Sequence, residues 1–161
     1  MRRLWWGALA LLLAASFAPA QKLPWQKSER PQDVRYLFPE QVSVPAGKDA
    51  VVELHFRINP GMHINSHTPS EKGLIATNLI LPENSGIKLD KAEFPAGSEY
   101  SLRAMPSMKL SVYTGEFVVR AHIRAAQGQH LVQGSLRYQA CDVNACYPPR
   151  KAPVVVDVIA K

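Results

Sequence analysis

The sequence predicts an all-β fold, an antiparallel sandwich, and three observations support this prediction. Apolar and polar residues alternate with a period of two, most clearly over Val52–Ile58. Clusters of Gly, Pro, Asn and Asp, which favour turns, separate short runs of this kind along the chain. No stretch of about twelve residues carries an amphipathic helical stripe. Many short strands at close spacing are typical of two packed antiparallel sheets.

The N-terminus has the features of a secretory signal peptide over residues 1–20. Arg2 and Arg3 precede the apolar run Leu4–Phe17, and Ala18-Pro19-Ala20 has the small-residue pattern of a cleavage site. The run is short for a membrane span, so we expect no stable membrane anchor after cleavage. The mature chain is expected in an oxidising compartment, the bacterial periplasm, where a disulfide persists.

The mature chain is expected to have two parts. Residues 21–38 are polar and contain prolines, which predicts an extended lead-in that Tyr36 and Leu37 tether to a sheet. Residues 39–161 are enough for one β-sandwich domain with its own core. Removal of the signal peptide lowers the formal charge from +6 to +4, and the remaining basic residues are scattered. The charge pattern therefore predicts no binding of nucleic acid.

Within the domain, each expected strand is bounded by a turn signal. The strands are expected at residues 41–44, 52–58, 78–81, 109–113, 117–123, 131–139 and 154–159. Thr114-Gly115-Glu116 predicts a hairpin between two of them. Phe94 to Met108 is expected to be a long loop, and long loops often act as lids or binding sites.

Both cysteines of the chain lie close together near its end. Cys141 and Cys146 are separated by four residues, after a predicted strand and before Pro148-Pro149. Asp142 and Asn144 between them suit a turn that would bring the sulfurs together. A disulfide across so short a loop contributes only about 2 kcal/mol as a staple. The spacing leaves a structural staple and a redox pair open, and it lacks the second Cys/His pair of a zinc site.

Two tyrosines and two histidines are the other candidate site residues. Tyr138 and Tyr147 flank the cysteines and are expected to shield them from water. His63 and His67, together with Met105 and Met108, have the ligand types of a copper site. The segment of the histidines is not helical, however, so their spacing does not put them on one face, and such residues also serve packing. A copper carrier is therefore a minor alternative, and no cofactor is predicted.

Four motifs together resemble a known family. They are Gly-Met-His-Ile-Asn-Ser at residues 61–66, Val-Tyr-Thr-Gly-Glu at 112–116, Tyr-Gln-Ala-Cys at 138–141 and Cys-Tyr-Pro-Pro at 146–149. These motifs resemble the N-terminal periplasmic domain of DsbD-type thiol:disulfide interchange reductases, over about residues 38–159. The resemblance implies an immunoglobulin-like antiparallel β-sandwich.

The resemblance also implies roles for individual residues. Cys146 would form the mixed disulfide with a partner protein, and Cys141 would be the resolving thiol. Four residues would line the site: His63, Asn65, Tyr138 and Tyr147. A cap loop would cover the cysteines until a partner docks, with Tyr100, Leu102, Met105 and Met108 as its counterpart in this chain. The cysteine spacing is one residue shorter than in the best-known members, and their aromatic cap cluster is not evident here.

The implied function is thiol–disulfide exchange of the protein-disulfide reductase type. In the family, the domain takes electrons from a thioredoxin-like domain and passes them to periplasmic thioredoxin-fold proteins, including disulfide isomerases and cytochrome c maturation reductases. The chain ends at Lys161 without that donor domain, so we expect a stand-alone module with a membrane-bound electron donor in trans. The alternative is an immunoglobulin-like periplasmic binding or scaffold domain with a structural disulfide.

Overall fold

The structure is a computed structural model that describes residues 30–37, 41–83, 85–102 and 105–161. The expected signal peptide and most of the expected lead-in lie outside this part of the chain. Residues 31–161 group into one unit, which is built of strands β1 to β12. The all-β class predicted from the sequence is thus confirmed. No helix among the described residues is long and apolar enough to cross a membrane.

The first sheet contains the segment with the clearest alternation. In β3, Val52, Leu54 and Phe56 are buried, while the side chains between them face outward. The four strands are antiparallel in the order β1-β3-β9-β6, with bounds β1 (Val34–Tyr36), β3 (Asp49–Ile58), β6 (Ile87–Glu93) and β9 (Glu116–Ala125). Strand β1 lies within the segment expected as the lead-in.

The second sheet is built around a long ladder between two strands. Strand β10 pairs with β12 from Gly128↔Ala160 to Tyr138↔Arg150. The order is β2-β12-β10-β5, with bounds β2 (Gln41–Val44), β5 (Asn78–Ile80), β10 (Gly128–Tyr138) and β12 (Arg150–Ala160). One pair departs from the antiparallel expectation, because β2 runs parallel to β12. In sequence β2 lies between two strands of the first sheet, so no tight turn joins it to β12 or fixes its direction.

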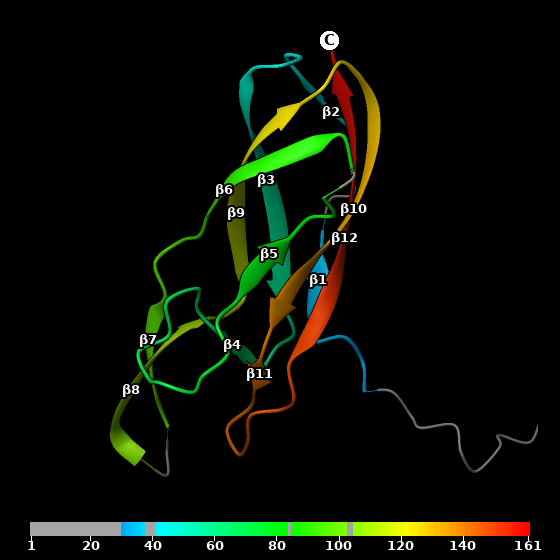
Figure 1. The fold of residues 1–161 in the computed structure, drawn as a ribbon. Helices are drawn as coiled ribbons and strands as arrows, with labels where there is room; N and C mark the ends of the chain where they lie inside the picture. Colours follow the sequence, from blue (N-terminus) through cyan, green and yellow to red (C-terminus); the bar gives the residue numbers. More distant parts are fainter. Residues whose placement is uncertain (1–29, 38–40, 84, 103–104) are drawn as a thin grey trace, which may run out of the picture. The chain divides into compact units, whose positions relative to one another are not determined.

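The two sheets pack face to face. Buried side chains of both join in one hydrophobic cluster, which includes Leu54, Phe56, Val119, Leu136 and Val154. Figure 1 shows β3 and β9 on one side of this core and β10 and β12 on the other. The predicted immunoglobulin-like β-sandwich is confirmed.

A third, smaller sheet lies beside the lower end of the sandwich in Figure 1. Its order is β11-β4-β8-β7, with bounds β4 (His63–Asn65), β7 (Ser98–Leu102), β8 (Met105–Tyr113) and β11 (Ala140–Cys141). The expectation of a loop from Phe94 to Met108 is wrong, because β7 and β8 pair as antiparallel strands there. We call β7 and β8 the cap hairpin.

The expected hairpin at Thr114-Gly115-Glu116 is also wrong. Strand β8 before the turn belongs to the third sheet, and β9 after it belongs to the first sheet. Gly115 has a φ of +62°, a left-handed conformation that glycine adopts without steric cost. Its carbonyl accepts a hydrogen bond of 2.8 Å from the N–H of Ile58. The turn is thus held against β3, and the chain passes from one sheet to the next.

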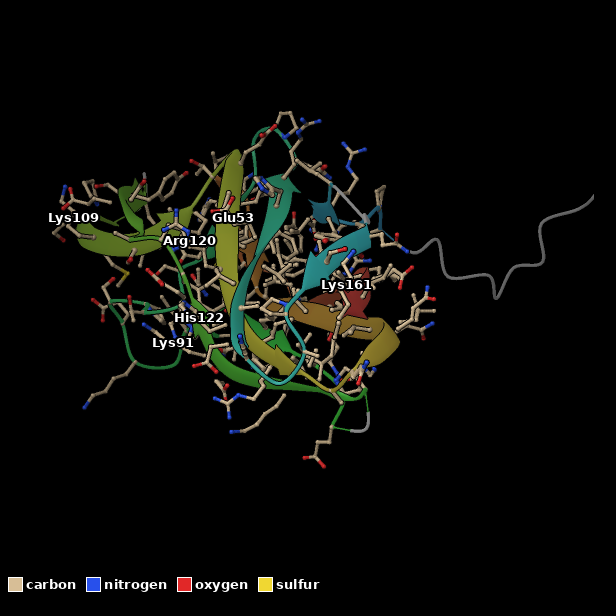
Figure 2. All side chains as sticks on the ribbon, turned by 90° about the horizontal axis from the view of Figure 1, so that it is seen from above. Glu53, Lys91, Lys109, Arg120, His122 and Lys161 are labelled. Atoms are coloured by element: carbon tan, nitrogen blue, oxygen red, sulfur yellow. A yellow bond between two sulfur atoms is a disulfide. The ribbon has the colours of Figure 1, made fainter. Side chains whose placement is uncertain are left out.

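The outer face of the first sheet carries ion pairs that follow the strand register. Opposite charges face each other at Asp49↔Arg124, Glu53↔Arg120 and Arg57↔Glu116, three directly paired positions of β3 and β9. Figure 2 shows Glu53 and Arg120 side by side, at an Nε–Oε1 distance of 3.1 Å. Each exposed pair contributes about 0–1 kcal/mol. Because a slipped register would break several pairs at once, they favour the observed pairing.

Leucines at two positions of β10 test the role of the core. Leu136 is 0% exposed, whereas Leu131 is 61% exposed. We expect Leu136→Ala to lower the free energy of unfolding by about 2–5 kcal/mol, since it removes buried methyl groups and leaves a cavity. Leu131→Ala should change it by about 0.5 kcal/mol or less. Denaturant unfolding of both variants checks this, and equal effects would contradict the assignment of the core.

Candidate functional site

The candidate site begins where β10 ends. After Tyr138 the chain leaves the second sheet, and at Ala140–Cys141 it joins the third sheet as β11. Strand β11 pairs with β4 in a register that places Ala140 opposite Ile64 and Cys141 opposite His63. Figure 1 shows β11 directly below β10, beside β4. The long β10–β12 ladder therefore determines where Cys141 lies.

Cys141 and Cys146 form a disulfide, with their Cα atoms 4.0 Å apart. The chain turns back between them: the N–H of Asp142 donates to the carbonyl of Ala145 at 3.0 Å, and that of Tyr147 to Ala140 at 2.9 Å. Cys141 is 0% exposed, whereas Cys146 is exposed. The buried Cys141 is thus closed to an incoming thiol or disulfide, and Cys146 is the cysteine that a partner can approach from solvent.

The Asp142 carboxylate holds this turn together. One oxygen accepts the backbone N–H groups of Asn144 at 2.7 Å and Ala145 at 2.9 Å. The other oxygen accepts the hydroxyl of Tyr147 at 2.6 Å. Hydrogen bonds to an ionised acceptor are among the stronger ones in proteins. Tyr147, expected as a shield, thus also connects the far side of the turn to Asp142.

A network of amide side chains supports the backbone around the cysteines. The Asn65 side chain is buried and donates to the Gln139 side-chain oxygen at 3.0 Å and to the Ile75 carbonyl at 3.2 Å. Gln139 also accepts the Ile75 N–H and donates to the Tyr147 carbonyl, each at 3.2 Å. Asn65 thus positions the chain that carries the cysteines. Sequence reasoning missed Gln139 as a site residue, although it lies within the Tyr-Gln-Ala-Cys motif.

The cap hairpin, which supplies two of the four strands of the third sheet, makes an aromatic contact with β4. The ring of Tyr100 in β7 lies against that of His63 in β4, with centroids 4.1 Å apart and planes tilted by 31°. Leu102 and Met108 are partly buried, and Met105 is the first residue of β8. An ion pair between Lys109 and Glu99, 2.7 Å long, joins the two strands of the hairpin. Of the four expected cap residues, Tyr100 has the ring contact with His63.

His63 is the most unusual polar residue of the site. It is 2% exposed, and its Nε2 has no hydrogen-bond partner among the described residues. Burial lowers its pKa below the ordinary value, and the charge of Asp142 partly opposes this shift. The imidazole is therefore held neutral next to the cysteines.

His67, the second expected copper ligand, has a different environment. Its ring stacks on Phe94 with centroids 4.4 Å apart, and its Nδ1 lies 2.9 Å from the carbonyl of Thr77. His63 and His67 are thus engaged with different aromatic rings. In the part of the chain that the structure describes, no three His, Cys, Asp or Glu side chains are grouped to hold a metal ion.

Tyr138 is placed in the core. Its side chain is fully buried in the hydrophobic cluster of the sandwich, and burial raises the pKa of its hydroxyl. It therefore anchors the end of β10, from which the chain continues to Cys141.

Comparison with known proteins identifies the family. The model of the family described as "Thiol:disulfide interchange protein DsbD, N-terminal" matches residues 33–157. The chain belongs to this family. The family is one of thiol–disulfide interchange proteins, and the matched residues of this chain include the disulfide-bonded Cys141 and Cys146.

Two solved structures are similar to this DsbD N-terminal family member. The reduced DsbD N-terminal domain of Neisseria meningitidis is 20% identical, with a TM-score of 0.46 over 68% of this chain and 78% of that chain. The N-terminal periplasmic domain of ScsB from Proteus mirabilis is 14% identical, with a TM-score of 0.49 over 70% of this chain and 42% of that chain. The present chain thus spans less than half of the ScsB chain. No curated protein matches it significantly.

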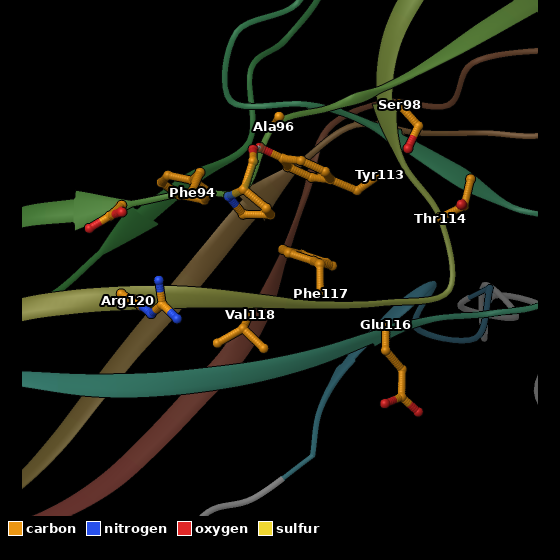
Figure 3. Close-up of a pocket in the computed structure, with 11 residues that line it drawn as sticks. Phe94, Ala96, Ser98, Tyr113, Thr114, Glu116, Phe117, Val118 and Arg120 are labelled. Atoms are coloured by element: carbon orange, nitrogen blue, oxygen red, sulfur yellow. The ribbon is translucent and has the colours of Figure 1, made fainter.

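Two surface pockets adjoin the third sheet. One, of about 500 Å³, is lined by His63, Tyr100 and Val143 together with the turn at residues 59–62. Val143 lies between the two cysteines, so this pocket borders the disulfide loop. The other, of about 380 Å³, is shown in Figure 3 and lies around Phe94, Tyr113 and Phe117. No residue of the disulfide loop lines it, whereas Val143 lines the first pocket, so we associate only the first pocket with the thiol chemistry of the DsbD family.

The buried imidazole predicts a pH dependence of stability. His63 has its ordinary pKa of 6.5 in the unfolded chain and a lower pKa in the folded one. As the pH falls below that value, the unfolded state binds a proton that the folded state does not, so stability is lost. We expect the free energy of unfolding to decrease more between about pH 7.5 and pH 5 for the wild type than for His63→Gln.

Tyr100→Phe is the control, because it keeps both the ring and the histidine. Denaturant titrations of the oxidised proteins across this pH range measure the difference. Parallel curves for the wild type and His63→Gln would contradict the assigned protonation state of His63.

Proposed function

We propose that this chain is a periplasmic thiol–disulfide exchange module that relays electrons through Cys141 and Cys146 to or from thioredoxin-fold proteins. Membership in a family of thiol:disulfide interchange proteins supports the general reaction. The observation that carries the finer proposal is the asymmetry of the pair: Cys146 is an exposed residue, whereas Cys141 is fully buried. This is the arrangement that a two-step exchange through a single attacking cysteine requires.

The proposed reaction transfers two electrons through a mixed disulfide. The Cys146 thiolate attacks a disulfide sulfur of the partner, which expels one partner thiolate and forms a Cys146–partner disulfide. The Cys141 thiolate then attacks the Cys146 sulfur, which expels the second partner thiolate and forms the Cys141–Cys146 bond. The partner gains two electrons and two protons, and the module is oxidised. Reduction by a donor follows the same steps in reverse.

The exposure of Cys146 favours this role over that of a staple. Closing so short a loop contributes only about 2 kcal/mol of stability in the chain-entropy model, whereas the sandwich already has a core that both sheets share. The pocket lined in part by Val143 gives a partner a mainly apolar surface beside the loop that joins Cys141 to Cys146. A thioredoxin-fold protein carries its reactive cysteine on its own surface, so it can dock against this apolar surface.

The proposal includes the setting of the domain. Residues 1–20 would direct the chain to the periplasm, residues 21–38 would be the lead-in, whose β1 joins the first sheet, and residues 39–161 would carry the exchange activity. The electron donor would be a membrane protein acting in trans, and the acceptors would be periplasmic thioredoxin-fold proteins such as disulfide isomerases or cytochrome c maturation reductases.

Single-cysteine variants test the two roles. The probe is a monothiol thioredoxin whose cysteine is activated as a disulfide with thionitrobenzoate. Reduced wild-type protein should release reduced thioredoxin and become oxidised, because Cys141 resolves the mixed disulfide. Cys141→Ser should instead accumulate a covalent thioredoxin adduct through Cys146. Cys146→Ser should form little adduct, because Cys141 is buried. Non-reducing electrophoresis measures all three outcomes.

Equal adduct formation by the two variants would contradict the assigned roles. The double variant Cys141→Ala/Cys146→Ala separates the relay from the alternative of a binding domain with a structural disulfide. A double variant that folds like the wild type but transfers no electrons supports the relay. One that unfolds, together with a wild type that does not exchange, would favour the structural disulfide.

A further inference from the structure

The second step of the proposed exchange raises a question about a proton. Cys141 must lose its proton before it attacks, because only the thiolate is nucleophilic. Its side chain is 0% exposed, so water does not reach it, and burial in apolar surroundings favours the protonated thiol. The negative charge of the adjacent Asp142 also disfavours a thiolate. A protein group that accepts the proton would remove this obstacle.

The pairing of β11 with β4 places one such group next to the thiol. Cys141 and His63 are directly opposite each other in an antiparallel pair. Side chains at such positions point to the same face, with Cβ atoms about 4.5–5.5 Å apart. His63 is 2% exposed, so the two side chains share a face that is closed to solvent. Tyr100 lies on the imidazole ring.

The imidazole is available for this role. Buried polar atoms are almost always hydrogen-bonded, and an exception in a folded protein calls for an explanation. The Nε2 of His63 is such an exception among the described residues. Burial keeps the ring neutral by lowering its pKa, so one ring nitrogen is unprotonated.

We propose that His63 accepts the proton of the Cys141 thiol when Cys141 resolves the mixed disulfide on Cys146. This inference rests on the proposed function and adds a proton path to it. The S–H bond of Cys141 breaks, and its proton moves to the imidazole. The Cys141 sulfur then bonds to the Cys146 sulfur and the partner thiolate leaves with the electron pair. The imidazolium returns its proton to the departing thiolate or to solvent.

The charges around His63 are compatible with this path. Asp142 on the cysteine loop interacts electrostatically with the ring and stabilises its protonated form. From the cap hairpin, Tyr100 contributes a neutral phenol. Arg57 and Glu116 line the same pocket, but they pair with each other at 2.6 Å. The net charge close to the imidazolium is therefore negative, which helps it to form during the reaction.

The test separates the two exchange steps in time. Reduced protein is mixed with dithiobis(nitrobenzoate) in excess, and the coloured thionitrobenzoate is followed by stopped-flow absorbance. Attack by Cys146 releases the first equivalent at a rate that depends on reagent concentration. Attack by Cys141 on the resulting mixed disulfide releases the second equivalent at a rate that is independent of reagent concentration. We expect His63→Gln to slow only the second phase, by about 100-fold or more near pH 7.

The pH profile distinguishes proton transfer from a structural role. The deficit of His63→Gln should shrink as the pH is raised into the alkaline range, because the thiol of Cys141 then ionises increasingly without a protein base. In the wild type, the rate of the second phase should rise with pH and reach a plateau near neutral pH. This measurement uses the wild-type protein alone, so it does not depend on whether a variant folds. His67→Gln, an exposed histidine on the same segment, is the matched control and should behave like the wild type.

Three results would overturn the inference. A second phase of wild-type rate in His63→Gln at neutral pH would exclude His63 as the acceptor and leave the relay intact. An equal slowing at every pH would show a structural role. If the wild type released only the first equivalent, Cys141 would not resolve the disulfide at all, and the proposed function itself would fail.

Discussion

The pairing of β11 with β4 is the constraint on which the arrangement of the site depends. A two-residue strand forms too few hydrogen bonds to fix its own position. Strand β11 continues from β10, however, and β10 is fixed in the second sheet by an eleven-residue ladder with β12. Gln139 lies at the crossing between the second and third sheets, and its side chain bonds to Asn65 of β4, to the backbone of Ile75 and to the backbone of Tyr147. The rigid sandwich thus sets the position of Cys141 and of the residue opposite it, His63.

The same arrangement explains why the two sulfurs differ in exposure. Cys141 belongs to strand β11, and its side chain points to a covered face of the sheet. Cys146 follows a turn that projects beyond the sheet. The Asp142 carboxylate shapes this turn with three hydrogen bonds, and none of them involves a sulfur. The turn can therefore keep its shape when the disulfide opens. A stable backbone with a reactive bond within it suits a module that cycles between two redox states.

The sequence predicted the fold class and many strands because burial on one face imposes a period of two, as in β3. It did not predict which sheet each strand joins. The Thr114-Gly115-Glu116 turn has the composition of a hairpin, yet the contact of Gly115 with Ile58 directs β9 into another sheet. The cap hairpin was missed for a similar reason. Strand β7 is the edge strand of a small sheet and, like the start of β8, is largely exposed, so the apolar alternation that indicates a strand is weak there.

For the site, the sequence indicated the cysteines and, through family resemblance, His63 and Asn65. The contacts that define their environment were not predictable, because they join residues far apart in the chain. Asn65 meets Gln139, and His63 meets Tyr100, only after three sheets have formed. A buried imidazole nitrogen with no hydrogen-bond partner among the described residues, such as Nε2 of His63, has no signature in sequence. The lack of a hydrogen bond depends on which polar groups the surrounding strands keep away from the ring.

The central claim is that the Cys141–Cys146 pair cycles between disulfide and dithiol, and its reduction potential tests this most directly. The protein is equilibrated in glutathione and dithiothreitol buffers, and free thiols are alkylated and counted. We predict a value in the range of thioredoxin-fold exchange proteins, roughly −270 to −120 mV. A value well below about −300 mV is typical of structural disulfides and would contradict the relay.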